Sequence, residues 1–174
     1  MRVFCQAESR LGLHLPVHRR LTDYGVKPVQ IIEPLYEYYW LYAALEPTTG
    51  EAFWWELPRL DADCFTVFLG QFGRQYPQSR NIVLLDQAPA HVAQCVVVPD
   101  KVGLVWLPPS IPALTPVERL WADLQYCIDV QNPAVRANLE AFREHIAGII
   151  RDYTAETVAS LTSYSYLVEA IYAL

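Results

Sequence analysis

Residues 105–121 read Val-Trp-Leu-Pro-Pro-Ser-Ile-Pro-Ala-Leu-Thr-Pro-Val-Glu-Arg-Leu-Trp, and this stretch joins an apolar run to the start of a helix. The run begins at Leu104 and has the length of a β-strand. Pro108, Pro109 and Pro112 follow it, and each proline fixes φ and lacks a backbone N–H. The stretch therefore predicts a strand that leads into a stiff, irregular loop.

The end of the same stretch predicts a helix whose first turn carries a carboxylate. Thr115 is a favoured N-cap residue, and Pro116 suits the first helical position. Glu118 lies three residues after Thr115, so it has the position of a capping-box residue that accepts the Thr115 N–H. A carboxylate between a strand, a rigid loop and a helix is equally suited to a functional site. Both roles for Glu118 stay open from these residues alone.

Composition and length predict one globular α/β domain spanning residues 1–174. Of the 174 residues, 53% are hydrophobic and 18% are charged, which excludes a disordered chain. The net charge of −6 argues against a basic protein that coats nucleic acid. Residues 1–30 nevertheless carry +3 while the remainder carries −9. A local contact with phosphate groups and an ordinary solvated loop are both compatible with this basic segment.

The cysteines and the N-terminus predict a cytoplasmic protein with reduced thiols. The four cysteines are scattered at positions 5, 64, 95 and 127, without the spacing of a zinc site or a disulfide framework. Charged residues interrupt any apolar N-terminal segment that could act as a secretion signal. No apolar run approaches the length of about 18 residues that a membrane span needs.

The hydrophobic pattern predicts a mixed sheet flanked by helices. A short strand at residues 3–5 is followed by loop and hairpin over residues 10–34, and aromatic-rich strands are expected at residues 36–45 and 51–57. Asp61 is placed to cap an amphipathic helix that ends near Tyr76. Buried parallel strands are expected at residues 81–86 and 102–107, with a short helix between them. Four further helices are predicted at residues 116–129, about 135–153, after Thr154, and 166–174. This order predicts an α/β fold with an antiparallel hairpin on one side and parallel strands on the other.

Asp86 and Glu118 are the candidate catalytic and metal-binding residues. Asp86 follows an apolar strand, and open α/β sheets place their sites at the carboxyl ends of such strands. One strand and one rigid loop separate Asp86 from Glu118, so both can face the same edge of the sheet. Carboxylates are hard oxygen ligands that suit Mg²⁺ or Mn²⁺. Each residue also has a structural alternative, a turn or helix cap for Asp86 and the capping box for Glu118.

Three motifs resemble the bacterial insertion-sequence transposases related to mariner elements, which carry a DDE catalytic domain of RNase H-like fold. In that family the first strand ends Asp-Glu-Ser/Gly, the second ends Asp-Asn-x-x-His, and the third segment reads Leu-Pro-Pro-Tyr-Ser-Pro-x-Leu-Asn-Pro-Ile-Glu-Arg-x-Trp. The corresponding residues here are Ala7-Glu8-Ser9, Asp86-Gln87-Ala88-Pro89-Ala90-His91, and Leu107 to Trp121. The resemblance covers essentially the whole chain, and the third motif is the most specific.

The resemblance implies cut-and-paste DNA transposition. In such transposases, three carboxylates hold two Mg²⁺ or Mn²⁺ ions, which serve phosphodiester hydrolysis and strand transfer. Asp86 and Glu118 match the second and third carboxylates. The position of the first carboxylate is occupied by Ala7. Glu8 follows it, but side chains alternate along a strand, so we expect Glu8 to point to the opposite face.

Ala7 predicts a weakened two-metal site and a slow or inactive enzyme. Other departures from the family pattern are Gln87 in place of Asn, Ser110-Ile111 in place of Tyr-Ser, and Thr115 in place of Asn. Several changes near one site indicate decay or repurposing, although Ala7 alone could also be an engineered change. The runner-up hypothesis is a non-catalytic remnant of the fold that binds DNA or protein. Another RNase H-like nuclease is a third hypothesis, which the proline-loop motif disfavours.

The resemblance also implies DNA as the partner. Such transposases usually carry N-terminal helix-turn-helix modules, and this chain begins at the first catalytic strand, so we expect that reader to be missing or separately encoded. A homodimer is a further possible assembly. His91 and Arg119 are possible supporting residues beside the carboxylates. The candidate DNA-binding residues lie in the basic segment: Arg10, His14, His18, Arg19, Arg20 and Lys27.

Overall fold

A mixed five-stranded sheet forms the centre of the protein. We describe a computed structural model over residues 1–13, 24, 37–108, 116–131 and 138–173. The strands lie in the order β3-β2-β1-β4-β5. Their bounds are β1 Arg2–Gly12, β2 Tyr38–Leu45, β3 Ala52–Leu57, β4 Asn81–Leu85 and β5 Val102–Trp106. The helices are α1 Ala62–Gln75, α2 Pro89–Val92, α3 Val117–Gln131, α4 Leu139–Asp152, α5 Ala155–Thr162 and α6 Ser165–Tyr172.

The strand directions confirm the predicted sheet. β1 pairs antiparallel with β2, and β2 pairs antiparallel with β3, which gives the hairpin side. β1 pairs parallel with β4, and β4 pairs parallel with β5. β1 is therefore the strand at which the sheet changes from antiparallel to parallel. The carboxyl ends of β1, β4 and β5 point the same way, which is the edge where the sequence predicts a site.

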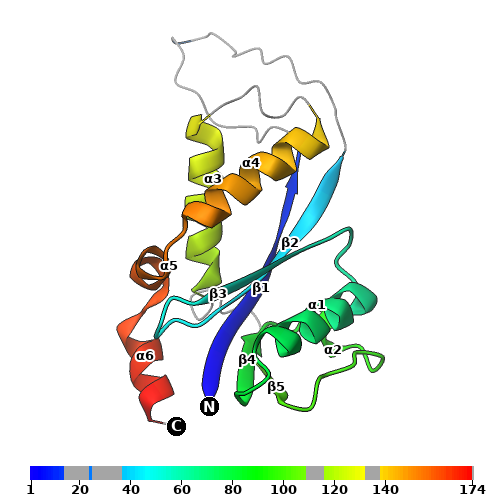
Figure 1. The fold of residues 1–174 in the computed structure, drawn as a ribbon, viewed down its shortest axis with the longest axis vertical. Coiled ribbons are helices and arrows are strands. Elements are labelled where there is room, and N and C mark those ends of the chain that lie inside the picture. The colour runs from blue at the N-terminus through cyan, green and yellow to red at the C-terminus, as the bar shows by residue number, and fades with distance from the viewer. Residues whose placement is uncertain (14–23, 25–36, 109–115, 132–137, 174) are drawn as a thin grey trace.

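Side-chain alternation along β1 divides the core between the two faces of the sheet. Phe4 packs with the aromatic residues of α1 on one face. Cys5 and Ala7 pack on the other face, against a cluster built from α3, α4, α5 and α6. Figure 1 shows this arrangement, with α1 and α2 on one side of the strands and α3 to α6 on the other. A site at the strand ends can thus draw residues from both helical layers.

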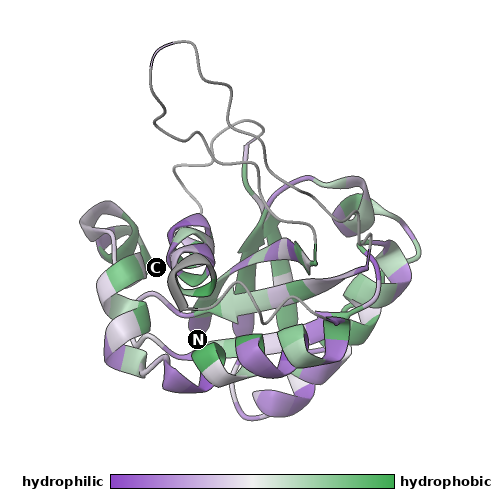
Figure 2. Ribbon diagram, turned by 90° about the horizontal axis from the view of Figure 1, so that it is seen from above, coloured by the Kyte–Doolittle hydropathy of each residue, from purple (hydrophilic) through white to green (hydrophobic). Residues whose placement is uncertain are grey.

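Amphipathic patterns and polar caps explain the helices. α1 buries Phe65, Phe68 and Phe72 along one stripe, and Asp61 caps it by accepting the Cys64 N–H, as predicted. Thr154 caps α5 in the same way. The helical ribbons carry both hydrophobic and hydrophilic residues (Figure 2). Among the described residues, none of the helices has both the length and the apolar character that crossing a bilayer requires.

Two strand predictions are wrong, and pairing with neighbours explains both. β1 continues to Gly12, well beyond residues 3–5, because its second half pairs with β2 as far as Tyr38. Polar residues in that half hid the strand signal from the sequence. The sequence predicts a buried strand over residues 102–107, but β5 is an edge strand, and Val105 and Trp106 are 44% and 47% exposed.

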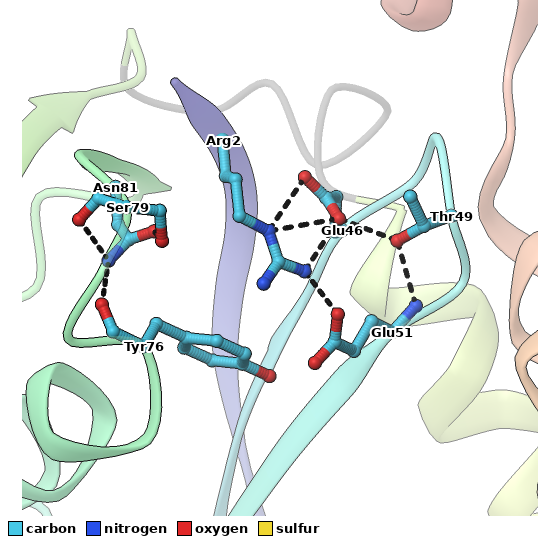
Figure 3. Close-up of polar contacts among 7 residues, drawn as sticks. All are labelled: Arg2, Glu46, Thr49, Glu51, Tyr76, Ser79 and Asn81. Atoms are coloured by element: carbon cyan, nitrogen blue, oxygen red, sulfur yellow. Dashed lines mark hydrogen bonds and ion pairs between the residues drawn. The ribbon is translucent and has the colours of Figure 1, made fainter.

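A partly buried ion-pair cluster joins the start of β1 to the turn between β2 and β3 (Figure 3). Arg2 donates to Glu46 from Nη2 at 2.7 Å and also contacts Glu51. Thr49 donates to the same Glu46 carboxylate. The Arg2 guanidinium lies over the Tyr76 ring, 4.6 Å from its centroid. Burial alone would raise the pKa of Glu46, but hydrogen bonds from Arg2 and Thr49 outweigh it and lower the pKa.

Replacing Arg2 with Met is expected to cost about 3 kcal/mol in the free energy of unfolding. The variant keeps most of the apolar contact but leaves the buried Glu46 carboxylate without its ion-pair partner, which is the costly way to break such a pair. Urea denaturation of the two proteins at pH 7 measures the difference. Glu51→Gln is the matched control, because Glu51 is half-exposed and its pair contributes about 1 kcal/mol or less. Equal losses in both variants would contradict the assignment.

The same cluster predicts a pH dependence of stability. The pKa of Glu46 is lower in the folded protein than its ordinary value of 4.5, so folding favours the charged carboxylate. This contribution is present above about pH 4.5 and is lost as the pH falls through the lowered folded-state pKa. Glu46→Gln is expected to be less stable than the parent at pH 7 and to flatten the decline below pH 4.5. Unchanged steepness in that variant would show that other groups cause the decline.

Candidate functional site

The site lies where β1 and β4 end at the same edge of the sheet. Cys5 pairs with Leu84 in the parallel register, and both pack on the α3 face. Two residues further along each strand come Ala7 and Asp86. Ala7 is half-buried against the α3-side core, and the Asp86 side chain is 70% exposed. The positions of the first and second expected carboxylates are thus adjacent, but only one carries a carboxylate.

Packing of α3 determines where Glu118 lies. Val117 and Leu120 are fully buried in the core between α3 and the sheet. Because they occupy the inward face of the first turn, Glu118 and Arg119 face outward and are exposed. Thr115 lies outside the described residues, so the capping-box alternative for Glu118 stays a prediction.

Asp86 is close enough to Glu118 to affect the protonation of the Glu118 carboxylate. Desolvation by the surrounding protein raises the pKa of Glu118, and the negative charge of Asp86 raises it further. Repulsion between two carboxylates is relieved by a cation between them. That the two carboxylates bind a metal ion together stays a prediction.

The donor set suits a divalent cation in type but is one carboxylate short. Asp86 and Glu118 offer the hard oxygen ligands that Mg²⁺ and Mn²⁺ prefer. Ala7 contributes only a methyl group at the adjoining position on β1. Over the described ranges, no group of three or more His, Cys, Asp or Glu residues is arranged to hold a metal ion. The residues present therefore fit partial metal ligation by two side chains.

A buried polar network reaches Asp86 from the other face of the sheet. His91, on α2, contacts Asp86 Oδ1 through Nδ1 at 2.8 Å and Glu8 Oε1 through Nε2 at 2.8 Å. Gln6 donates to the same Glu8 oxygen at 2.6 Å. The ring of His91 packs on Phe65 of α1, with centroids 4.5 Å apart. Glu8 thus lies on the face opposite Ala7, as the alternation of the strand predicts.

Opposing effects set the protonation of His91. Burial disfavours the charged imidazolium and lowers the pKa of His91, but the hydrogen bond and charge of Glu8, followed by those of Asp86, raise it by more. The net pKa is above the ordinary value of 6.5. A protonated His91 ring donates from both nitrogens, so it can form hydrogen bonds with Asp86 and Glu8 at the same time.

Apart from His91, the predicted supporting and DNA-binding residues that the structure describes make contacts away from Asp86. The Arg119 guanidinium lies over the ring of Tyr164, 5.6 Å from its centroid, which gives it a packing contact with the start of α6. Arg10 is exposed at the far half of β1 and lies over the Tyr38 ring. The remaining candidate DNA-binding residues lie outside the described residues: His14, His18, Arg19, Arg20 and Lys27.

Glu8, Gln6 and Gln87 take part in the site without having been assigned a role from the sequence. Gln87 donates from Nε2 to the Leu107 carbonyl at 2.9 Å, which ties the loop after β4 to the loop after β5. Gln6 and Glu8 are polar residues two positions apart in a buried strand. Such spacing places both side chains on one face, and this is the signal that could have identified them.

Comparison with known proteins identifies the family of this chain. Residues 8–156 match the sequence model of a family described as DDE superfamily endonuclease. A curated relative, "Uncharacterized protein y4pE/y4sA" of Sinorhizobium fredii, is 36% identical over 83 residues, which is 47% of this chain and 62% of the relative. The chain thus spans less than two thirds of that relative.

Solved structures of Mos1 transposase share the fold. The Mos1 mariner paired-end complex with Mn matches with a TM-score of 0.70 and 18% identity, over 97% of this chain and 53% of that chain. The Mos1 strand transfer complex matches with a TM-score of 0.71 and 17% identity, over 97% of this chain and 52% of that chain. At these identities the likeness shows an RNase H-like fold, and this chain spans about half of each Mos1 chain. With a family match over most of its length and this fold, the chain belongs to the DDE superfamily endonucleases.

Proposed function

We propose that this chain is the catalytic part of a DNA transposase, whose chemistry is metal-dependent cleavage and transfer of DNA strands. The observation that supports the proposal is the position of Glu118 near Asp86, which follows β4: the negative charge of Asp86 raises the pKa of Glu118. Mos1 transposase, which shares the fold, has been solved as a paired-end complex with a transposon end and as a strand transfer complex. DNA is the corresponding proposed partner here.

In this proposal each side chain has a defined task. Asp86 and Glu118 would hold Mg²⁺ or Mn²⁺ at the edge of the sheet. When bound, such ions activate water or a hydroxyl and stabilise the charge on the phosphodiester. Gln87 ties the loops after β4 and β5 together, which fixes the backbone beside Asp86. The exposed side chains of Asp86 and Glu118 leave that edge open to a large substrate such as DNA.

Ala7 favours a second candidate, a non-catalytic member of the fold that binds DNA or protein. Without a carboxylate at position 7 of β1, the second metal would be weakly held, and the proposed enzyme would be slow or inactive. The proposal also includes a cytoplasmic location for the protein. It further includes a separate domain or chain that recognises DNA, and assembly as a homodimer.

Titration with Mn²⁺, followed by electron paramagnetic resonance, tests the two candidates. The enzyme requires at least one Mn²⁺ bound through Asp86, so Asp86→Asn should abolish that binding. The same samples are then assayed for nicking of supercoiled DNA with Mg²⁺. No Mn²⁺ binding by the parent above the Asp86→Asn background would favour the binding module. Strong Mg²⁺-dependent nicking by the parent would refute the proposed impairment by Ala7.

DNA binding by the basic segment predicts a steep salt dependence. Each phosphate contact contributes about 0.9 to the slope of log affinity against log salt concentration. Replacing both Arg19 and Arg20 with Ala should therefore weaken binding and lower the slope by about 2. Fluorescence anisotropy with a labelled duplex over a range of NaCl concentrations measures the slope. Arg74→Ala removes a basic side chain outside the segment and should leave the slope unchanged, and an equal effect there would contradict the assignment.

A further inference from the structure

A chain of buried polar contacts links one face of the sheet to a candidate metal ligand at its edge. It runs from Gln6 to Glu8 on β1, then to His91 on α2, and ends at Asp86 after β4. The side chains of Glu8 and His91 are only 7% and 1% exposed. Solvent exposure therefore changes sharply along this series of contacts: the Asp86 side chain is 70% exposed, while the Glu8 and His91 side chains are enclosed.

A contribution to folding stability does not by itself explain this series of buried polar contacts. Moving a carboxylate and an imidazole out of water costs free energy. A protein with apolar residues of similar size in their place is often equally stable or more stable. Apolar neighbours are available, since His91 packs on Phe65 and Phe4 lies on the same face of β1. Polar residues retained in an apolar layer are explained when they perform a task that apolar residues cannot perform.

The geometry at Asp86 identifies that task. Oδ1 of Asp86 accepts from His91 Nδ1 at 2.8 Å and from the Ala88 N–H at 2.9 Å. Two donors on one oxygen restrict rotation of the carboxylate. Glu8 in turn holds the far nitrogen of His91, and Gln6 holds Glu8. An exposed side chain thereby receives a fixed orientation from enclosed residues.

We propose that His91 and Glu8 are positioning residues that fix the Asp86 carboxylate for metal binding. The inference rests on the proposed function in assigning Asp86 to the metal. It adds that the contacts that orient Asp86 are present although position 7 carries no carboxylate. A second hydrogen-bonded shell of this kind orients metal ligands in many proteins, and its mutation lowers metal affinity by about 10- to 100-fold.

Two conservative variants separate positioning from structural support. In His91→Asn, the amide nitrogen takes the place of Nδ1, so the contact with Asp86 is kept and the contact with Glu8 is lost. In His91→Gln, the amide lies near Nε2, so the contact with Glu8 is kept and the contact with Asp86 is lost. Both variants place a neutral amide in the same enclosed position, so a general structural cost affects both.

The experiment has a metal-free arm and a metal arm. NMR couplings that report the χ1 angle of Asp86 should show one rotamer in the parent and in His91→Asn, and averaged rotamers in His91→Gln. Mn²⁺ affinity, measured in the Ala7→Asp background, should fall about 10-fold or more for His91→Gln and by about 3-fold or less for His91→Asn. Circular dichroism and thermal unfolding verify that each variant is folded.

The two arms keep the inference separate from the proposed function. An unchanged Asp86 rotamer in His91→Gln would show that the turn contact with Ala88 suffices, and this overturns the inference. Equal losses of Mn²⁺ affinity in both variants would also overturn it, because they indicate a structural role. If Ala7→Asp binds no Mn²⁺, the proposed function fails and the metal role with it, while averaged rotamers in His91→Gln would still establish that His91 orients Asp86.

Discussion

Ala7→Asp is expected to raise Mg²⁺-dependent DNA nicking by about a hundredfold or more over the parent chain. Ala7 lies on the α3 face of β1, and Asp86 directly follows the neighbouring strand β4, so an Asp at position 7 would add a third carboxylate to Asp86 and Glu118. A metal ion contributes several kcal/mol to such a reaction, and about 1.4 kcal/mol corresponds to a factor of ten in rate. Nicking of supercoiled plasmid under single-turnover conditions measures the change.

Metal binding gives a second readout that does not depend on activity. Without metal, a third carboxylate near Asp86 and Glu118 adds repulsion, so Ala7→Asp should unfold at a lower temperature than the parent. Adding Mn²⁺ should reverse this, since a ligand at 100 times its dissociation constant stabilises the folded state by about 2.7 kcal/mol.

Ala7→Asn is the matched control, because the amide has the size of Asp but not its charge. It should show neither the gain in nicking nor the Mn²⁺-dependent stabilisation. Equal behaviour of Ala7→Asp and Ala7→Asn would contradict the assignment of position 7 as the missing ligand. Activity of Ala7→Asp that persists after Asp86→Asn would contradict the site as a whole.

Gly50→Ala is expected to destabilise the fold by about 3 kcal/mol or more. Gly50 lies in the turn between β2 and β3 and has a φ of 74°, a conformation that costs other residues energy. A Cβ there would lie 1.8 Å from the carbonyl oxygen of Ala155 and 2.9 Å from the backbone nitrogen of Ala159. Both are backbone atoms of the α5 region, so no side-chain rotation can relieve the clash.

Thermal unfolding measures this effect, and a second glycine provides the control. At about 2–4 °C per kcal/mol for a chain of this size, Gly50→Ala should lower the Tm by roughly 6–12 °C. Gly70 lies inside α1, and a Cβ there meets no described heavy atom within 4 Å. Gly70→Ala should therefore raise stability by up to about 1 kcal/mol through helix propensity. A Gly50→Ala variant as stable as the parent would show that α5 does not pack tightly on the turn.

Periodic segments were predictable because their signals are local. The prediction of the helix after Asp61 is confirmed in its N-cap and its buried stripe, because both depend on residues a few positions apart. The second half of β1 and the exposure of Val105 and Trp106 were missed because they depend on which strand lies alongside. Strand pairing joins residues far apart in the sequence, so the hydrophobic pattern of one segment cannot reveal it.

The candidate site shows the same division between local and distant information. Their positions after a strand and at a helix start made Asp86 and Glu118 candidates, and the family resemblance implied that Ala7 occupies the position of the first carboxylate. The sequence alone could not assign a role to Glu8, which alternation excluded as a ligand on the α3 face. The contact of Glu8 with His91 joins residues 83 positions apart and requires α2 to fold back over the α1 face.

The sequence by itself therefore determined the types of most secondary-structure elements, the order of the candidate functional residues and the family resemblance, because these depend on residue identity and spacing. Only the tertiary structure decided which side chains meet. It placed Glu8 and His91 behind Asp86, directed Arg119 to Tyr164, and made β5 an edge strand. The physical reason is that burial and hydrogen bonding act between neighbours in space, and the packing of two helical layers on one sheet sets those neighbours.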